Sequence, residues 1–168
     1  YPAIHPLLSY SEDADVLDTF WKENGNPGWL AQRRRFLTLL EKQARLERMA
    51  RIVGKDALPP SQQQVLLSAE LINEAFLRQS AFSAKDRYCS AARQIQMMNI
   101  ISQFIDLSES AVEQQVSVDA INKLPVMRRL RRMGEDIGND EIEKFNQLRN
   151  TMVSEFTQLT RSATSNAR

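Results

Sequence analysis

Few side chains in this chain have the type and spacing that catalysis or metal binding requires. The single histidine, His5, has no second histidine, cysteine or aspartate at ligand spacing, which favours an incidental histidine over a metal ligand. The single cysteine, Cys89, lies close to Lys85 and Arg87 but has no histidine nearby, so a small half-buried thiol is favoured over a nucleophile. These two residues predict neither a metal site nor a covalent catalyst.

The acidic side chains and the glycines also lack the arrangement of a catalytic site. Glu41, Glu47, Glu70 and Glu74 fall on expected helix faces that hold arginines or face solvent, where surface ion pairs explain them. The chain has only 5 glycines, and neither G-x-x-x-x-G-K-[ST] nor G-x-G-x-x-G occurs. We therefore assign no catalytic residue and no phosphate-binding loop.

Composition indicates a single domain over residues 1–168. Apolar residues make up 42% of the chain and charged residues 26%, with a net charge of +1, which argues against disorder and allows one buried core. One cysteine excludes a disulfide framework. No apolar run is long enough for a membrane span, and no secretory signal is present. The abrupt start without methionine indicates a piece of a longer chain.

Hydrophobic spacing predicts an all-α fold, an antiparallel bundle of about five to six helices. Pro2 and Pro6 predict an extended segment over residues 1–10, and the polar tail over about residues 161–168 is expected to be disordered. Pro125 should interrupt the fifth helix. The helices are expected over about residues 11–22, 27–53, 60–79, 90–115, 117–134 and 140–160.

Positive charge is concentrated in two stretches of the sequence. Residues 22–55 hold nine basic and three acidic side chains, a net charge of +6, and Arg128-Arg129-Leu130-Arg131-Arg132 forms a second cluster. Acidic residues follow the second cluster directly, so pairing within the protein or between subunits is favoured over nucleic-acid binding. The basic face of the second helix consists of Arg33, Arg34, Arg35, Lys42, Arg45, Arg48 and Arg51.

Two connecting segments are candidates for function. Residues 79–90 hold Phe82 and Tyr88 among small and charged residues, which fits either packing under a bundle end or an aromatic pocket for a flat ring. Residues 55–62 form a turn stiffened by Pro59 and Pro60, which fits either a plain connector or a tip that presses on a partner.

Five strings together carry a family resemblance. They are Tyr1-Pro2-Ala3-Ile4, Leu8-Ser9-Tyr10-Ser11, Arg51-Ile52-Val53-Gly54-Lys55-Asp56-Ala57-Leu58-Pro59, Phe76-Leu77-Arg78-Gln79-Ser80-Ala81-Phe82 and Asp86-Arg87-Tyr88-Cys89-Ser90. In order and spacing, over about residues 1–105, they closely resemble the C-terminal domain of the catalytic A subunit of archaeal-type and vacuolar-type rotary ATPases. Arg131-Arg132-Met133 and the last helix are similar to the same family less specifically.

The resemblance implies a role in a larger machine. Such a protein makes or hydrolyses ATP with Mg²⁺, and its phosphate loop and metal site would lie in a domain upstream of Tyr1. This chain alone should therefore bind no cofactor and be inactive. The implied partners are the B subunit of the catalytic head and the central-stalk shaft. The implied location is cytoplasmic, at the membrane periphery without insertion, and no nucleic acid is expected.

The resemblance also implies two sites. Phe76-Leu77-Arg78-Gln79 is similar to a sequence that precedes the adenine pocket in the related F-type beta subunit, which places Phe82 beside adenine and Tyr88 second. By position, the tip resembles the F-type loop that touches the rotor. The implied contact residues are Lys55, Asp56, Ala57, Leu58, Pro59 and Pro60. The tip lacks the F-type acidic cluster, which favours steric pushing over charge. Alternatives are a free-standing helical adaptor that binds a coiled-coil or acidic partner, and a nucleic-acid-binding bundle.

Overall fold

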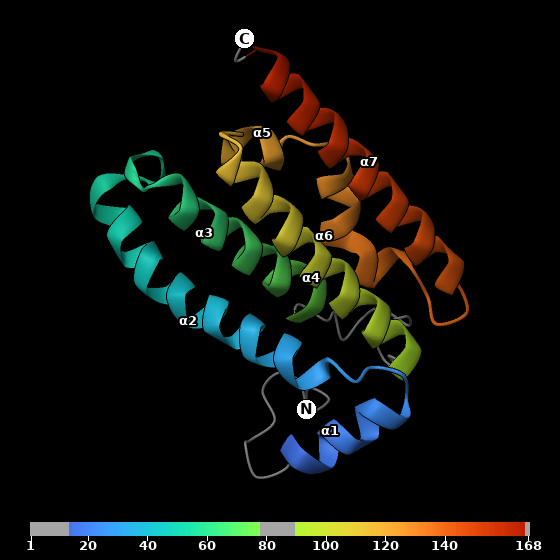
Figure 1. The fold of residues 1–168 in the computed structure, drawn as a ribbon. Coiled ribbons are helices and arrows are strands. Elements are labelled where there is room, and N and C mark those ends of the chain that lie inside the picture. Colours follow the sequence, from blue (N-terminus) through green and yellow to red (C-terminus); the bar gives the residue numbers. More distant parts are fainter. Residues whose placement is uncertain (1–13, 78–89, 167–168) are drawn as a thin grey trace.

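The structure is a computed structural model that describes residues 14–77 and 90–166. These residues form helices and no strand, which confirms the all-α prediction. Figure 1 shows α2, α3 and α4 side by side, with α6 and α7 on the far side of α4. The described α-helices are α1 (Ala14–Glu23), α2 (Trp29–Val53), α3 (Pro60–Ile72), α4 (Ala91–Glu113), α5 (Val118–Asn122), α6 (Val126–Asp136) and α7 (Ile142–Asn166).

The main core lies around α3 and α4, which are covered on both sides by other helices. In α4 the buried residues recur at helical spacing and include Met98, Ile101 and Phe104. Phe104 packs edge-on against Phe156 of α7, with the two ring centroids 5.8 Å apart. At the other end, Trp21 and Trp29 stack at 6.0 Å and join α1 to α2.

Hydrogen bonds between buried or half-buried polar side chains fix how the central helices align. Gln64 of α3 donates to the hydroxyl of Ser108 in α4 at 2.8 Å. Gln32 of α2 donates to Asn99 of α4, also at 2.8 Å. A shift of one helix along another would leave these groups unpaired inside the protein, which is costly. The two bonds therefore hold α2, α3 and α4 in one register.

Two expected helices differ in detail from the structure. The helix expected over residues 60–79 ends as α-helix at Ile72 and continues as a π-helical turn, η3 (Asn73–Leu77). The helix expected over residues 117–134 is divided into α5 and α6, as Pro125 predicts. The N–H of Val126, at the start of α6, donates to the Glu155 carboxylate of α7 at 2.9 Å.

The last helix extends beyond its expected end. The expectation of a disordered tail over about residues 161–168 is wrong for residues 161–166, because α7 remains helical to Asn166. One reason is that Ala163 packs against the main core. Another is that the hydroxyls of Ser162 and Thr164 bond carbonyl oxygens four residues earlier, which satisfies polar groups that otherwise favour turns.

Candidate functional site

The connection between α2 and α3 forms a compact tip at one end of the molecule (Figure 1). α2 ends at Val53, and Gly54 reverses the chain with φ of 88° and ψ of 148°, a backbone conformation that favours glycine. The N–H of Gly54 still bonds the Ala50 carbonyl at 2.8 Å. A 3₁₀ turn, η2 (Lys55–Ala57), follows, and Pro60 begins α3 at a position where proline fits a helix.

A small core of its own lies beneath this tip. Leu46 of α2, Leu58 of the turn and Leu66 of α3 are buried together, and Ala50 and Val65 pack against them. Leu58 is only 4% exposed. Of the six predicted contact residues, Leu58 thus points inward and anchors the turn. The other five, which are Lys55, Asp56, Ala57, Pro59 and Pro60, are exposed.

Polar contacts hold the turn against α3. The Gln63 side chain donates to the carbonyl of Leu58 at 2.8 Å and to the carbonyl of Asp56 at 3.5 Å. Lys55 pairs with Glu70 at 2.7 Å, a contact that solvent exposure makes weak. The tip is therefore fixed mainly by the small core and by the amide of Gln63.

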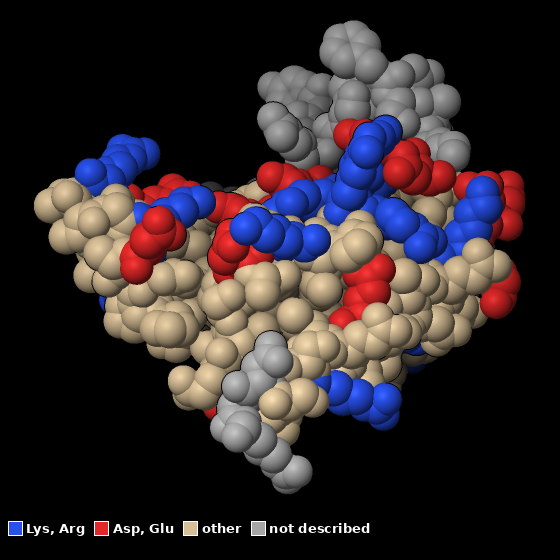
Figure 2. All heavy atoms as spheres, turned by 90° about the horizontal axis from the view of Figure 1, so that it is seen from above, with Lys and Arg blue, Asp and Glu red and all other residues tan. Residues whose placement is uncertain are grey.

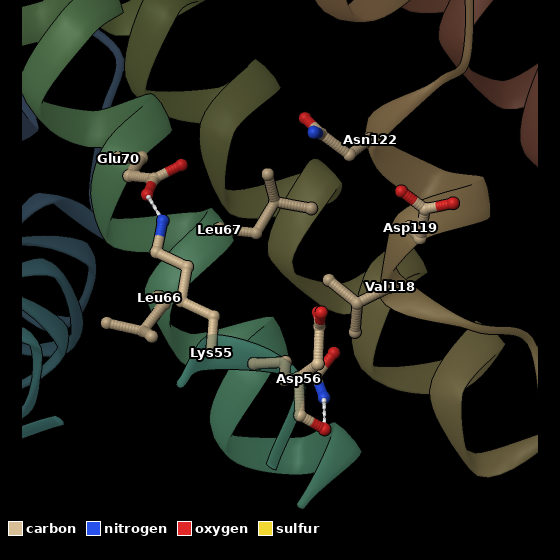
Figure 3. Close-up of a pocket in the computed structure, with 9 residues that line it drawn as sticks. Lys55, Asp56, Leu66, Leu67, Glu70, Val118, Asp119 and Asn122 are labelled. Carbon is tan, nitrogen blue, oxygen red and sulfur yellow. Dashed lines mark hydrogen bonds and ion pairs between the residues drawn. The ribbon is translucent and has the colours of Figure 1, made fainter. Parts of the chain in front are cut away.

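A cavity of about 140 Å³ lies between the tip, α3 and α5 (Figure 3). Leu66, Leu67 and Val118 contribute its apolar part, and Lys55, Asp56, Glu70 and Asp119 contribute its charged part. Outside it, Asp119 pairs with Lys123 at 2.7 Å. The hydrogen bond and the charge of Asp119 raise the pKa of Lys123 above its ordinary value of 10.5. The cavity separates the tip from α5, so the tip touches the rest of the bundle mainly through α2 and α3.

The predicted basic face of α2 divides into two parts. Near the start of the helix, Arg35 pairs with Asp106 at 2.7 Å and with Glu109 at 3.2 Å, both on α4. Arg33 lies over the Trp29 ring at 5.9 Å, a cation–π contact. Towards the tip, Arg45 and Arg48 are exposed and make no ion pair with any residue in the described ranges. The second part of the face is therefore the part more available to a partner.

The second basic cluster pairs largely within the protein. Arg131 contacts Glu74 at 3.1 Å, and Arg132 contacts Glu135 and Asp136 at 3.6 and 3.3 Å. Figure 2 shows the same pattern, with Lys and Arg interleaved with Asp and Glu across the middle of the surface. These pairs agree with the prediction that the acidic residues after the cluster would neutralise it.

The predicted adenine-pocket residues Phe82 and Tyr88 lie outside the described residues, as do His5 and Cys89. The described chain on either side of that segment meets the end of α6. A Cβ on Gly134 would lie 2.8 Å from the Ala75 carbonyl oxygen, so only glycine lets α6 approach η3 this closely. The N–H of Ser90 bonds Asn139 at 3.1 Å.

One buried cation in this region has no clear signal in the sequence. Arg93 of α4 is 1% exposed. Its Nε donates to the Ile137 carbonyl at 2.9 Å, and its guanidinium also donates to the Gly134 carbonyl. The signal is weak because Arg93 stands in a polar stretch near a helix start and resembles a surface residue. It ties the start of α4 to the end of α6.

Two other kinds of site do not occur in the described ranges. Residues 14–77 and 90–166 contain no group of three or more His, Cys, Asp or Glu side chains that could hold a metal ion. None of the helices in these ranges combines the length and the apolar character that crossing a bilayer requires.

The described chain is therefore an all-α domain whose most distinctive feature is a fixed two-helix tip with its own small core. The sequence profile of one family, the C-terminal domain of V and A type ATP synthase, matches residues 18–122. The chain belongs to this family, which confirms the resemblance carried by its sequence motifs.

Individual relatives agree with this assignment. The catalytic-head protein named as the A subunit of the A-type ATP synthase in Thermococcus onnurineus is 40% identical over 159 residues, which is 95% of this chain and 27% of the relative. The protein of the same name in Pyrococcus abyssi is 37% identical over 88% of this chain and 15% of its own length. That of Thermofilum pendens is 36% identical over 81% of this chain and 23% of its own length. The chain thus spans at most about a quarter of these relatives.

Proposed function

We propose that this chain is the C-terminal lever domain of the catalytic subunit of an ion-translocating rotary ATP synthase or ATPase. The observation that carries the proposal is the tip: Leu58 anchors it in a small core, and exposed residues such as Lys55 and Pro60 stand at its surface. The family of the chain supports the proposal, and so does the name of its relatives, the A subunit of the A-type ATP synthase.

A lever must be stiff, and the described helices supply that stiffness. A close-packed interior transmits a displacement without absorbing it. Here the main core runs along α3 and α4, and the bonds from Gln64 to Ser108 and from Gln32 to Asn99 prevent sliding of the helices. Rotation of the domain on nucleotide binding would therefore move the tip as a unit and push the central-stalk shaft. During synthesis the shaft would push the tip in the reverse direction.

The proposal requires a contact that differs between the two positions of the domain, because a ligand shifts an equilibrium only by its difference in affinity for the two states. We assign that contact to Phe82, with Tyr88 second, beside the adenine of ATP or ADP. The phosphates and Mg²⁺ would bind in the upstream domain, so the 168-residue chain alone should show no ATPase activity. In the intact subunit, Phe82→Ala should weaken ATP binding by about 1–3 kcal/mol, the scale of aromatic–base stacking. Unchanged affinity would exclude this role.

Shortening the tip tests the lever itself. Removing residues 56–59 and rejoining the helices in the intact subunit should leave ATP hydrolysis in place and abolish the ion transport that accompanies it. The measurement is ion uptake per ATP hydrolysed in vesicles that hold the assembled complex. Preserved coupling would show that the tip is only a connector. The proposed partners are the shaft and the B subunit, and the proposed location is the cytoplasmic periphery of the membrane.

A free-standing adaptor is the second candidate, because Arg45 and Arg48 make no ion pair within the described ranges. An adaptor would bind an acidic or coiled-coil partner without an attached catalytic domain. The two functions are separated by the reading frame upstream of Tyr1. A phosphate-loop sequence, G-x-x-x-x-G-K-[ST], in that frame supports the lever, and a frame without it supports the adaptor.

A further inference from the structure

The end of α2 carries a cluster of exposed apolar side chains beside the tip. Ile52 is 85% exposed, Val53 56% and Met49 43%. The remaining large apolar residues with comparable exposure in the described ranges are Val16 and Phe20, which belong to α1 at the opposite end of α2. Exposed apolar clusters of this kind mark contact sites, because leaving them in water is unfavourable.

The cluster shares its helix face with positive charge. Arg45, Arg48, Met49 and Ile52 follow the i, i+3, i+4, i+7 spacing that places side chains on one face of a helix, and all four are exposed. Leu46 and Ala50 occupy the opposite face and pack into the small core. In Figure 2, the end of the molecule where the tip lies is largely uncharged and is bordered by Lys and Arg side chains. We call Arg45, Arg48, Met49, Ile52 and Val53 the α2 strip.

We propose that the α2 strip is a docking surface for one acidic, amphipathic helix of a protein partner. This inference rests on the proposed lever function and deepens it, because it places the contact on the last two turns of α2 as well as on the turn after them. Ile52 and Met49 bury apolar side chains of the partner helix, and Arg45 and Arg48 pair with its flanking carboxylates.

The charge of the strip selects the partner's chemistry. No acidic residue lies on the face between Arg45 and Ile52, since Glu47 falls on a different side of the helix and accepts a hydrogen bond from Gln43. A basic partner helix would meet two uncompensated arginines there, and an uncharged one would leave both of them without a counter-charge. The contact therefore combines apolar burial with positive charge on this chain and negative charge on the partner.

Photo-crosslinking in the intact, assembled complex tests the proposal. A benzophenone amino acid is placed at position 52, and separately at position 16, another strongly exposed apolar position, on α1. We expect position 52 to give an adduct with a helical segment rich in Asp and Glu, and position 16 to give no adduct with that segment. An adduct at position 52 with a basic or non-helical segment, or no adduct to another subunit, overturns the proposal.

Charge reversal gives a second, independent measurement. Arg48→Glu should reduce ion transport per ATP hydrolysed several-fold, and more strongly at low salt than at high salt. Arg161→Glu, an exposed arginine on α7, serves as the matched control and should leave transport unchanged. If shortening the tip uncouples the complex but Arg48→Glu does not, the lever stands and the docking proposal is overturned. If neither change uncouples it, both are overturned. Thermal unfolding of the 168-residue chain confirms that each variant folds.

Discussion

Truncation of Leu58 to alanine tests whether the tip is held by its own small core. Leu58 is 4% exposed and packs with Leu46 and Leu66. Leu58→Ala removes about three buried carbon groups at about 0.8 kcal/mol each, which gives about 2.4 kcal/mol, and a residual cavity adds to this. The stiff Pro59-Pro60 sequence limits how far the turn can collapse into the space. We expect a loss of about 2–4 kcal/mol in the free energy that keeps the tip closed.

Two assays read this effect separately. Urea unfolding of the 168-residue chain measures global stability, and amide hydrogen exchange measures opening of the tip. Exchange at residues 55–58 should speed up strongly, while exchange in α4 should change less. Ile52→Ala is the matched control, because Ile52 is 85% exposed and its truncation should cost less than about 0.5 kcal/mol. Equal effects of the two substitutions would refute the small core as the anchor of the tip.

Three further changes test other parts of the structure. Gly134→Ala should destabilise the chain by about 1–3 kcal/mol in urea unfolding, because the new methyl group meets the backbone carbonyl of Ala75; an unchanged midpoint would contradict the close approach of α6 and η3. Gly54→Ala should cost about 1–2 kcal/mol in the same assay, since its φ of 88° disfavours any side chain although space is open there. Lys123 has a raised pKa in the folded chain, so its pairing with Asp119 stabilises the fold below the unfolded-state pKa and is lost as pH rises above 10.5 through the folded-state value; Lys123→Met should remove that part of the pH dependence, measured as stability in urea between neutral and strongly alkaline pH.

Much of the fold was predictable, because helices signal themselves through spacing. The apolar set of α4 and the break at Pro125 both followed from the sequence, and Gly54 with Pro59-Pro60 located the tip. The end of α7 was missed because Ser and Thr at 160–165 have low helix preference, while packing of Ala163 overrides it.

The site was less predictable for a physical reason. A single leucine in a turn has no periodicity, so nothing in the sequence indicates that Leu58 points inward and Ile52 outward. The same holds for Arg93, whose burial depends on carbonyl groups 41 and 44 residues away in the chain. The adenine-pocket role of Phe82 and Tyr88 stays a prediction, as does the contact of the tip with a shaft.

The separate core beneath the tip has a consequence for how such a domain evolves. Leu46, Leu58 and Leu66 belong to the small core and to no part of the main one, and Val65 packs against both. Substitutions at the tip are therefore buffered from the packing of α4 and α7. The tip can diverge in step with a changing partner while selection preserves the bundle, so related proteins should differ most in length and charge around residues 48–62.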